Sequence, residues 1–344
     1  MGKNKILEKW VYDFSEVEEK ISQEIQKFLP DCAFDSHAHI YRVRDQDFDY
    51  YIKGKANWFK SGPENLTITV WRRHMKKLLG KTKPASGFFS VVPFMKDVFE
   101  KGNKFLIGQL KKNPDCYGLL FVTPDSENPQ IEKYLKHSQI VGFKVYHVHS
   151  KITPTINSPV SGFLPERLWE IANHYELIIL LHPVRYFTIA DAENYLFIRK
   201  MCKKYSDVKL ILAHMGASFN TYNFEDGIEK LKDIENIWVD TSVICESSTI
   251  VSAIKKLGVK KVLWGTDYPL SQRRGRSFTL GDGFLWLDTE NFEWNKYPSC
   301  HPVCFGLEEL RAVKQASEIL QLTSSEIRDI FYNNAINLIK KSSC

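Results

Sequence analysis

Two histidines one residue apart, His37 and His39, follow an apolar, strand-like run that begins at Cys32. On a β-strand, residues i and i+2 point to the same face, so both imidazoles can be directed at one point. Two convergent imidazoles are typical ligands of a metal ion. A single His-x-His pair is weak evidence, and its interpretation depends on what accompanies it in the chain.

Four further polar residues lie at or near the ends of later strand-like runs, in the order Lys144, His182, His214 and Asp267. Buried strand ends are unfavourable places for imidazoles and carboxylates unless a partner satisfies them. A divalent metal ion is such a partner, because histidines with an aspartate form a suitable donor set and leave one position open for water. The ion would lower the pKa of that water from 15.7 toward about 7. We therefore expect a metal-activated water, with Asp267 accepting its proton and His214 orienting water or polarising the substrate.

The elements that must position these residues are eight short, β-like runs that alternate with helical patterns. The runs span residues 32–41, 86–94, 116–123, 139–147, 177–183, 208–216, 236–242 and 261–268. Several are almost continuously apolar, which is typical of parallel strands that helices cover. Eight such units predict an α/β protein of the (β/α)8 TIM barrel class, with its active site at the carboxyl ends of the strands. An open doubly wound sheet is the competitor, but no Gly-x-Gly-x-x-Gly follows the first run.

The segment before the first strand has apolar residues at helical spacing. We expect one domain over residues 1–344, in which residues 1–30 form an N-terminal helical extension. Residues 31–344 then form the barrel of a metal-dependent hydrolase, including the helices at the end of the chain. Ser15 and Glu18 have the spacing of a capping box, which predicts a helix start within the extension.

Two connections are long, residues 42–65 after strand 1 and residues 270–305 after strand 8, and both would emerge at the active-site face. Their many aromatic residues predict lids or binding loops and argue against disorder. Arginines at this face suit carboxylate or phosphate groups, because guanidinium binds such groups with paired hydrogen bonds. The residues expected to contact a small anionic substrate are Lys144, Tyr146, Arg185, Arg42 and Arg274.

Composition narrows the choice of partners and location. A net charge of +6 over 344 residues suits a small anionic molecule but is too modest to predict nucleic-acid binding. No run of eighteen apolar residues occurs, so we expect no membrane span. The seven scattered cysteines are typical of reduced thiols, and the start of the chain has no apolar signal core, which together predict a cytoplasmic protein. The N-terminal helix and the second long connection make a homodimer plausible.

Five motifs resemble, in combination, those of the amidohydrolase superfamily. They are Asp35-Ser36-His37-Ala38-His39, Gly142-Phe143-Lys144, Leu181-His182-Pro183, Ala213-His214-Met215-Gly216 and Gly265-Thr266-Asp267-Tyr268-Pro269. The most similar branch is the amidohydrolase-related group that includes aminocarboxymuconate-semialdehyde decarboxylase and related metal-dependent hydrolases. The resemblance implies that His37, His39, His182 and Asp267 bind a divalent ion, commonly zinc with manganese as the alternative. It also implies that His214 is the catalytic histidine beside that ion.

The number of metal ions is left open by the resemblance. Other branches hold two ions bridged by a carboxylated lysine, and Lys144, His182 and His214 could supply that arrangement. The branch that this chain most resembles has a similar Gly-x-Lys without a second metal, so one ion is favoured over two. In that case the ammonium of Lys144 can hold a substrate carboxylate or phosphate.

The sequence thus predicts a metal-dependent hydrolase that opens an amide, lactone or ester of a small anionic molecule. The alternative is a carboxy-lyase, a non-oxidative decarboxylase of a small carboxylic acid, aromatic acids included, because the most similar branch contains such enzymes. The two reactions use the same residues and the sequence does not separate them. A metal-dependent deoxyribonuclease is disfavoured, because that related branch normally has a glutamate where this chain has Lys144. A non-catalytic barrel is disfavoured because every expected metal position is filled.

Overall fold

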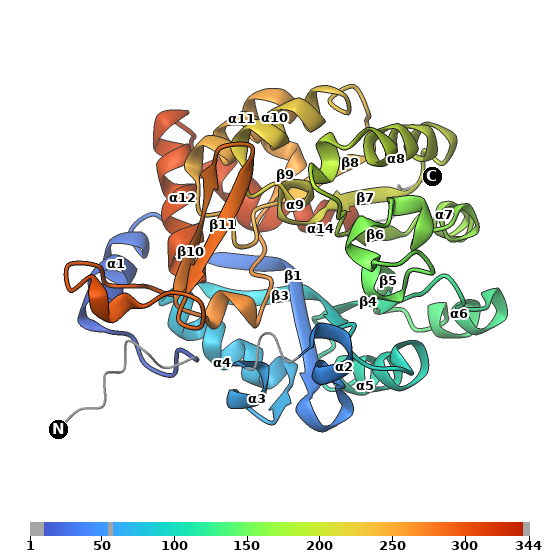
Figure 1. The fold of residues 1–344 in the computed structure, drawn as a ribbon, viewed down its shortest axis with the longest axis horizontal. Coiled ribbons are helices and arrows are strands. Elements are labelled where there is room, and N and C mark those ends of the chain that lie inside the picture. The colour runs from blue at the N-terminus through green and yellow to red at the C-terminus, as the bar shows by residue number, and fades with distance from the viewer. Residues whose placement is uncertain (1–9, 54–57, 340–344) are drawn as a thin grey trace.

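Eight parallel strands form the centre of the molecule in the computed structural model, which describes residues 10–53 and 58–339 (Figure 1). They are β1 (Cys32–Arg42), β3 (Lys83–Val91), β4 (Tyr117–Phe121), β5 (Ile140–Val145), β6 (Ile178–Leu181), β7 (Lys209–Leu212), β8 (Ile237–Asp240) and β9 (Val262–Leu263). Neighbours pair in parallel in this order, and β2 (Asn65–Leu66) adds an antiparallel edge beside β1. Each of the eight predicted runs overlaps one of these parallel strands.

The first and last of these strands meet and close the sheet on itself. Ala38 of β1 forms a parallel bridge with Tyr268, which lies just beyond β9. The amide of Ser36 donates to the carbonyl of Trp264 at 3.0 Å, and the amide of His39 donates to that of Tyr268 at 2.8 Å. The predicted (β/α)8 barrel is therefore confirmed.

Helices surround the barrel and cover the outer face of its strands (Figure 1). They are α4 (Ile68–Leu79), α5 (Asn103–Leu110), α6 (Asn128–Leu135), α7 (Glu166–His174), α8 (Ala192–Lys204), α10 (Thr221–Glu229), α11 (Ser247–Leu257) and α12 (Phe305–Ile319). Buried Trp71 and Trp169 pack between these helices and the sheet. Among the described residues, no helix is both long and apolar enough to cross a membrane.

The interior of the barrel is filled at one end by apolar side chains. Ile178 and Leu180 share the inward face of β6 with His182, since alternate residues of a strand point the same way. They belong to a buried cluster that packs against Ala335 and Leu338 of α14 (Asn334–Ile339). The last helix therefore covers one end of the barrel, and polar residues concentrate at the opposite end.

The N-terminal helix is shorter than the predicted extension. Helix α1 (Glu16–Ile25) begins at the predicted capping box, in which Ser15 accepts from the amide of Glu18 and Glu18 accepts from the amide of Ser15. Residues 10–14 before it are not helical. The first part of the extension, residues 1–9, lies outside the described residues.

The two long connections contain more regular structure than expected. The connection after strand 1 holds the short helices α2 (Phe48–Ile52) and α3 (Trp58–Ser61). The connection after strand 8, predicted only as a long loop, contains an antiparallel hairpin of β10 (Gly275–Leu280) and β11 (Gly283–Asp288). Its two-residue turn, Gly281-Asp282, is a hairpin signal that sequence reasoning overlooked.

Candidate active site

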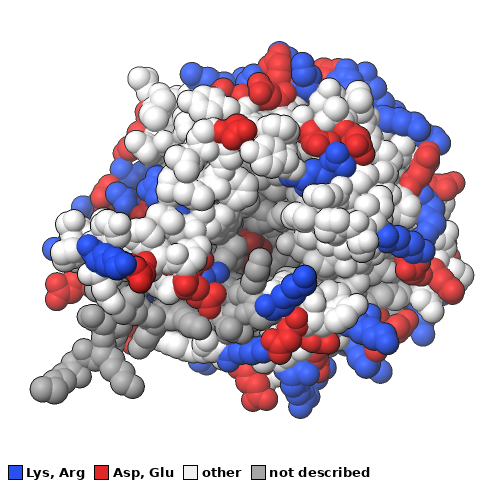
Figure 2. Space-filling view, in the orientation of Figure 1, with Lys and Arg blue, Asp and Glu red and all other residues white. Residues whose placement is uncertain are grey.

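A cavity of about 430 Å³ opens at the carboxyl ends of the barrel strands, and Figure 2 shows it as a hollow with a largely uncharged rim. Its polar floor consists of the six residues that the strand ends were predicted to bring together, His37, His39, Lys144, His182, His214 and Asp267. Tyr146 lies beside them, and aromatic residues that include Phe59, Phe219 and Trp286 line the walls. Residues far apart in the chain therefore meet in one pocket, as the barrel prediction required.

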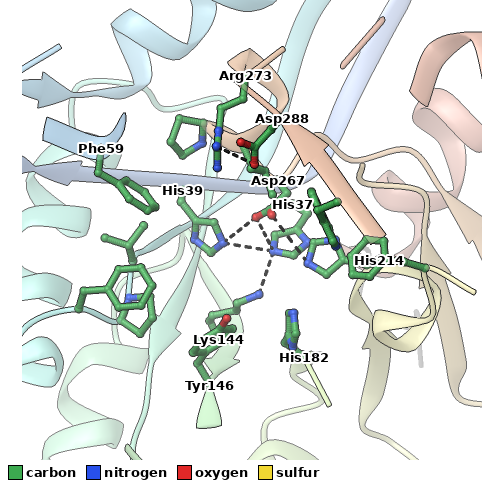
Figure 3. A pocket seen from close by; sticks show the side chains of 17 residues that line it. His37, His39, Phe59, Lys144, Tyr146, His182, His214, Asp267, Arg273 and Asp288 are labelled. Carbon is green, nitrogen blue, oxygen red and sulfur yellow. Dashed lines mark hydrogen bonds and ion pairs between the residues drawn. The ribbon is translucent and has the colours of Figure 1, made fainter. Parts of the chain in front are cut away.

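Three imidazoles on the floor, those of His37, His39 and His214, lie around the carboxylate of Asp267 (Figure 3), and the ring of His182 lies next to that of His214, with centroids 5.1 Å apart. The Nε2 atoms of His37 and His39 lie 3.2 Å apart. Asp267 Oδ1 lies 3.6 Å from the first and 3.2 Å from the second. Asp267 Oδ2 lies 3.8 Å from His214 Nε2, and one donor atom from each of His37, His214 and Asp267 falls within 4.8 Å of the others. This spacing allows several of these atoms to bind one ion.

The other ring nitrogen of each histidine is occupied by the protein. The Nδ1 partners are Asp240 Oδ2 for His37 (3.1 Å), Ser90 Oγ for His39 (2.9 Å), Pro183 O for His182 (3.0 Å) and Ser242 Oγ for His214 (2.8 Å). Such partners fix the orientation of a metal-binding imidazole and leave Nε2 as the ligand atom. The donor set therefore fits a divalent metal ion such as zinc or manganese.

Asp240 is a site residue that sequence reasoning missed. It is fully buried at the end of β8, and besides the His37 ring its carboxylate accepts the amides of His214 (2.9 Å) and Ser242 (3.1 Å). It therefore holds two of the floor histidines in place. The available signal was a carboxylate at the end of an apolar strand-like run, the same pattern that pointed to Asp267.

Burial and neighbouring charge set the ionisation of the floor. Burial lowers the pKa of His37 and His182 well below the usual value and lowers that of His39 too, which keeps these imidazoles neutral and able to bind a cation. Burial raises the pKa of Asp267, but His214, His39 and His37 outweigh it and hold that pKa well below its usual range. The floor therefore places the ionised carboxylate of Asp267 beside the neutral imidazoles of His37 and His39.

Lys144 points into the pocket from β5, and Tyr146, the residue just after that strand, also lines it. The Nζ atom of Lys144 lies 2.8 Å from His37 Nε2, and burial lowers the pKa of this lysine to about 8 against the opposing effect of Asp267 and Asp240. The ring of Tyr146 meets that of His182 edge-on, with centroids 5.0 Å apart. Both side chains stand where a substrate bound above the floor would contact them.

The three arginines expected to contact substrate lie elsewhere. Arg274 is fully buried in an ion pair with Glu18, whose Oε2 lies 2.7 Å from its Nη2. Arg185 pairs with Asp191 at 2.9 Å. Arg42 pairs with Asp45 at 2.5 Å, and the guanidinium lies over the ring of Phe105. None of these three arginines lines the cavity, because carboxylates of the protein hold their guanidinium groups outside it.

The arginine that lines the cavity is Arg273, the neighbour of Arg274 in sequence. Its Nη2 lies 2.7 Å from Oδ2 of Asp288, which also lines the cavity, and both side chains are only 8% exposed. Figure 3 shows this pair across the cavity from Lys144. The sequence did not distinguish the two arginines, because the side to which each points depends on how the second connection packs.

Comparison with known families identifies the chain. The sequence profile of the amidohydrolase family matches residues 77–340, about three quarters of the chain. The chain belongs to the amidohydrolase family. The matched region includes Lys144, His182, His214 and Asp267, whereas His37 and His39 precede it. No curated protein sequence matches the chain.

Solved structures of amidohydrolases share the fold at low sequence identity. A probable 2-pyrone-4,6-dicarboxylic acid hydrolase from Acinetobacter baumannii, with citric acid bound, has 14% identity and a TM-score of 0.57, over 89% of this chain and 98% of that one. A dihydroxybenzoic acid decarboxylase from Polaromonas sp. JS666, with manganese and the inhibitor 2-nitroresorcinol, has 16% identity and a TM-score of 0.58, over 90% and 97%. An amidohydrolase from Burkholderia multivorans with bound zinc has 10% identity and a TM-score of 0.57, over 90% and 99%. The chain is therefore an enzyme of the amidohydrolase family with a barrel fold, and its structural relatives include both hydrolases and decarboxylases.

Proposed function

We propose that this protein is a metal-dependent hydrolase that opens a lactone, ester or amide of a small, ring-shaped carboxylate. The observation that carries the proposal is the floor of the cavity, where the neutral imidazoles of His37 and His39 lie 3.6 Å and 3.2 Å from the ionised carboxylate of Asp267 beneath aromatic walls. We assign His37, His39, His182 and Asp267 to one divalent ion, zinc or manganese. A bound ion of this kind polarises a carbonyl group and makes water a better nucleophile.

Asp267 and His214 supply the proton transfers in this proposal. The carboxylate of Asp267 is ionised, so it can accept a proton from the attacking water and pass it to the leaving oxygen or nitrogen. The Nε2 atom of His214 lies 3.8 Å from that carboxylate while Ser242 holds the other side of the ring. His214 is thus placed to orient the water or the substrate carbonyl above Asp267.

The remaining pocket residues suit an anionic ring. Lys144 on the floor and Arg273 at the opposite side provide two cationic groups for carboxylates. The rings of Phe219 and Trp286, with centroids 4.8 Å apart, form part of an apolar wall against which a flat molecule can pack. The cavity of 430 Å³ is of the size that accommodates a small molecule.

Decarboxylation of an aromatic acid is the second candidate. The aromatic walls favour a planar ring, and one structural relative is a dihydroxybenzoic acid decarboxylase. In this reaction Asp267 or His214 would deliver the proton that replaces carbon dioxide on the ring. The same floor residues would be required, so the products decide between the two functions.

The test assays the zinc-loaded and the manganese-loaded protein on two substrates in parallel. Hydrolysis of 2-pyrone-4,6-dicarboxylate is followed by proton release, and decarboxylation of 2,6-dihydroxybenzoate by release of bicarbonate. Proton release without bicarbonate, abolished in Asp267→Asn, is the expected result for this class of lactone. Release of bicarbonate would instead show that the protein is a decarboxylase, the second candidate. Inactivity toward both substrates and toward a panel of aryl esters and amides of ring carboxylates would contradict both.

We further propose that the enzyme acts in the cytoplasm on a free small molecule. The six cysteines among the described residues are unpaired thiols, in keeping with a reducing compartment. A homodimer stays a prediction, which light scattering of the purified protein at several concentrations would test.

A further inference from the structure

Two adjacent arginines beyond β9 point in opposite directions. The backbone of Arg273 is extended, with φ −91° and ψ 149°, and successive side chains of an extended chain point to opposite sides. Arg273 therefore faces the cavity, where its guanidinium meets Asp288. Arg274 faces away from the cavity and toward Glu18 at the start of α1.

The buried carboxylate of Glu18 hydrogen-bonds to three segments of the chain: its own N-terminal segment, the segment after β9 and the residue just before α12. Its Oε1 accepts from Arg274 Nε at 3.0 Å and from the amide of Cys304 at 2.9 Å. Its Oε2 accepts from Arg274 Nη2 at 2.7 Å and from the amide of Ser15 at 2.7 Å. Glu18 is fully buried and Arg274 is 1% exposed, so water does not replace these contacts.

Backbone hydrogen bonds attach the same segments to each other on both sides of the arginine pair. The amide of Val11 donates to the carbonyl of Gln272 at 3.0 Å, and the amide of Phe305 donates to the carbonyl of Arg273 at 2.8 Å. Residues 10–18 therefore pack along the outside of the chain that carries Arg273 over the cavity. We call residues 269–276 and 284–290, which include Arg273 and Asp288, the roof.

The hairpin of β10 and β11, whose base belongs to the roof, is held by different contacts at its two ends. At the tip, Asn220 Nδ2 donates to the carbonyl of Gly281 at 3.1 Å and to that of Gly283 at 2.5 Å. At the base, Gly275 pairs directly with Asp288, so the position of Asp288 depends on the segment that Glu18 holds. Loss of the Glu18 contact should therefore loosen the base, where Arg273 and Asp288 lie, and leave the tip attached.

We propose that Glu18 is a positioning residue for substrate binding: through Arg274 it sets the place of Arg273 and Asp288 over the cavity. The N-terminal segment is then part of the substrate site although it contacts no substrate. The proposal rests on the proposed function, in which Arg273 binds an anionic group of the substrate. It predicts an effect on affinity for anionic ligands and none on the metal ion, because the floor histidines are held by Asp240, Ser90, Pro183 and Ser242.

The test compares Glu18→Gln with Glu19→Gln, the same chemical change at an exposed position of the same helix. Glutamine keeps one acceptor oxygen, but its NH2 group replaces the other, so two of the four donors around Glu18 lose their acceptor and Arg274 loses the opposite charge. Hydrogen–deuterium exchange measures protection of residues 269–276 at the base and 279–284 at the tip. Calorimetric titration with benzene-1,3-dicarboxylate, a ring dicarboxylate without a hydrolysable bond, measures Kd. Elemental analysis measures bound metal, and steady-state kinetics on the substrate separates KM from kcat.

We expect Glu18→Gln to exchange faster at the base only, and to raise Kd and KM about tenfold, as expected for a displaced charge-assisted contact. Metal content and kcat should match those of the wild type, and Glu19→Gln should behave as the wild type throughout. A purely structural role would change thermal stability without the split between KM and kcat. A folded Glu18→Gln protein with wild-type exchange at the base and wild-type Kd would overturn the proposal.

A second variant keeps the test decisive if Glu18→Gln does not fold. Arg274→Lys keeps the charge but loses the fork that reaches both carboxylate oxygens, so the same changes should occur at smaller size. Unchanged exchange and Kd in Arg274→Lys would likewise overturn the proposal. If the wild type is inactive toward both substrates and the panel of esters and amides described above, the proposed function fails, and base exchange alone then decides whether Glu18 positions the roof.

Discussion

The floor and the roof of the cavity are built from different parts of the chain. The floor consists of side chains at the carboxyl ends of barrel strands, such as His37 on β1 and Asp267 beyond β9. The roof consists of the connection after the barrel closes, with Arg273 and Asp288, and is held from outside by the N-terminal segment. Strands hydrogen-bonded on both sides hold the floor, whereas a buried ion pair and a few hydrogen bonds to distant segments hold the roof.

Under the proposed function, this difference would separate the chemistry from the part of substrate selection that Arg273 supplies. Metal binding needs several donor atoms at defined positions, and rigid strand ends provide that precision. Substrate recognition resides in connecting segments, which can change without disturbing the barrel. Changes to the floor should therefore affect metal content and turnover together, and changes to the roof should affect affinity alone.

The largest effect is expected for Asp267→Asn on the floor. The amide cannot accept the proton from water and is a weaker metal ligand, so kcat/KM should fall by about 10³-fold or more. The measurement is turnover together with metal content per chain. Activity retained in a protein that has lost its metal would contradict the proposal that the floor residues carry out a metal-dependent reaction.

Glu18→Gln should cause the largest loss of stability. Removing one partner of a buried ion pair leaves the other charge uncompensated, which typically lowers the free energy of unfolding by about 3–5 kcal/mol. Urea denaturation of the variant and of Glu19→Gln would measure the difference. A double variant, Glu18→Leu with Arg274→Met, should recover much of the stability without recovering ligand affinity, and recovery of both would argue that the pair has no positioning role.

Asp240→Asn should weaken the floor without touching substrate. The carboxylate orients His37 and binds the amide of His214, and partners of this kind usually change metal affinity or activity by about 10–100-fold. Competition with a chromogenic chelator would measure the metal affinity. Asp226→Asn, at an exposed position of α10, is the matched control. Unchanged metal affinity would show that Asp240 serves only the packing of β8.

Arg273→Gln should affect the roof alone. Loss of the cationic group should raise KM for an anionic substrate by about tenfold, the usual effect of one charge-assisted hydrogen bond, with kcat and metal content unchanged. A neutral ester of the same substrate should show no such change. An equal effect on the charged and the neutral substrate would contradict a role for Arg273 in binding an anion.

The smallest effect concerns His74, which lies between the N-terminal segment and the barrel. Its Nδ1 is 3.0 Å from the hydroxyl of Tyr268, and burial together with Arg73 lowers its pKa to about 4. The unfolded chain therefore binds one more proton than the folded protein between pH 6.5 and pH 4. The contribution of His74 to the free energy of unfolding is complete above this window and is lost as the pH is lowered through it. Denaturation experiments across this range should show that the free energy of unfolding of His74→Gln falls by about 2 kcal/mol less than that of the wild type. His174→Gln, at an exposed position, should keep the wild-type profile.

Most of the floor could be predicted from sequence because local patterns mark it. Apolar runs of strand length end in His37, His182, His214 and Asp267, and the barrel rule places all such ends together. Asp240 escaped notice although it ends the run before Asp267, since a single carboxylate without a motif resembles any loop residue. The hairpin after strand 8 also carried a signal, the Gly281-Asp282 turn, which a reading of that segment as a loop passed over.

The sequence by itself determined the barrel, the amidohydrolase resemblance and the residues of the floor, because strand periodicity and the order of motifs are local properties. Only the tertiary structure decided which arginine faces the cavity. Arg273 and Arg274 are neighbours with the same chemistry, and their roles differ because Glu18, more than two hundred residues away in the chain, binds one of them. The directions of side chains in a long connection depend on contacts with distant segments, and no local pattern encodes those contacts.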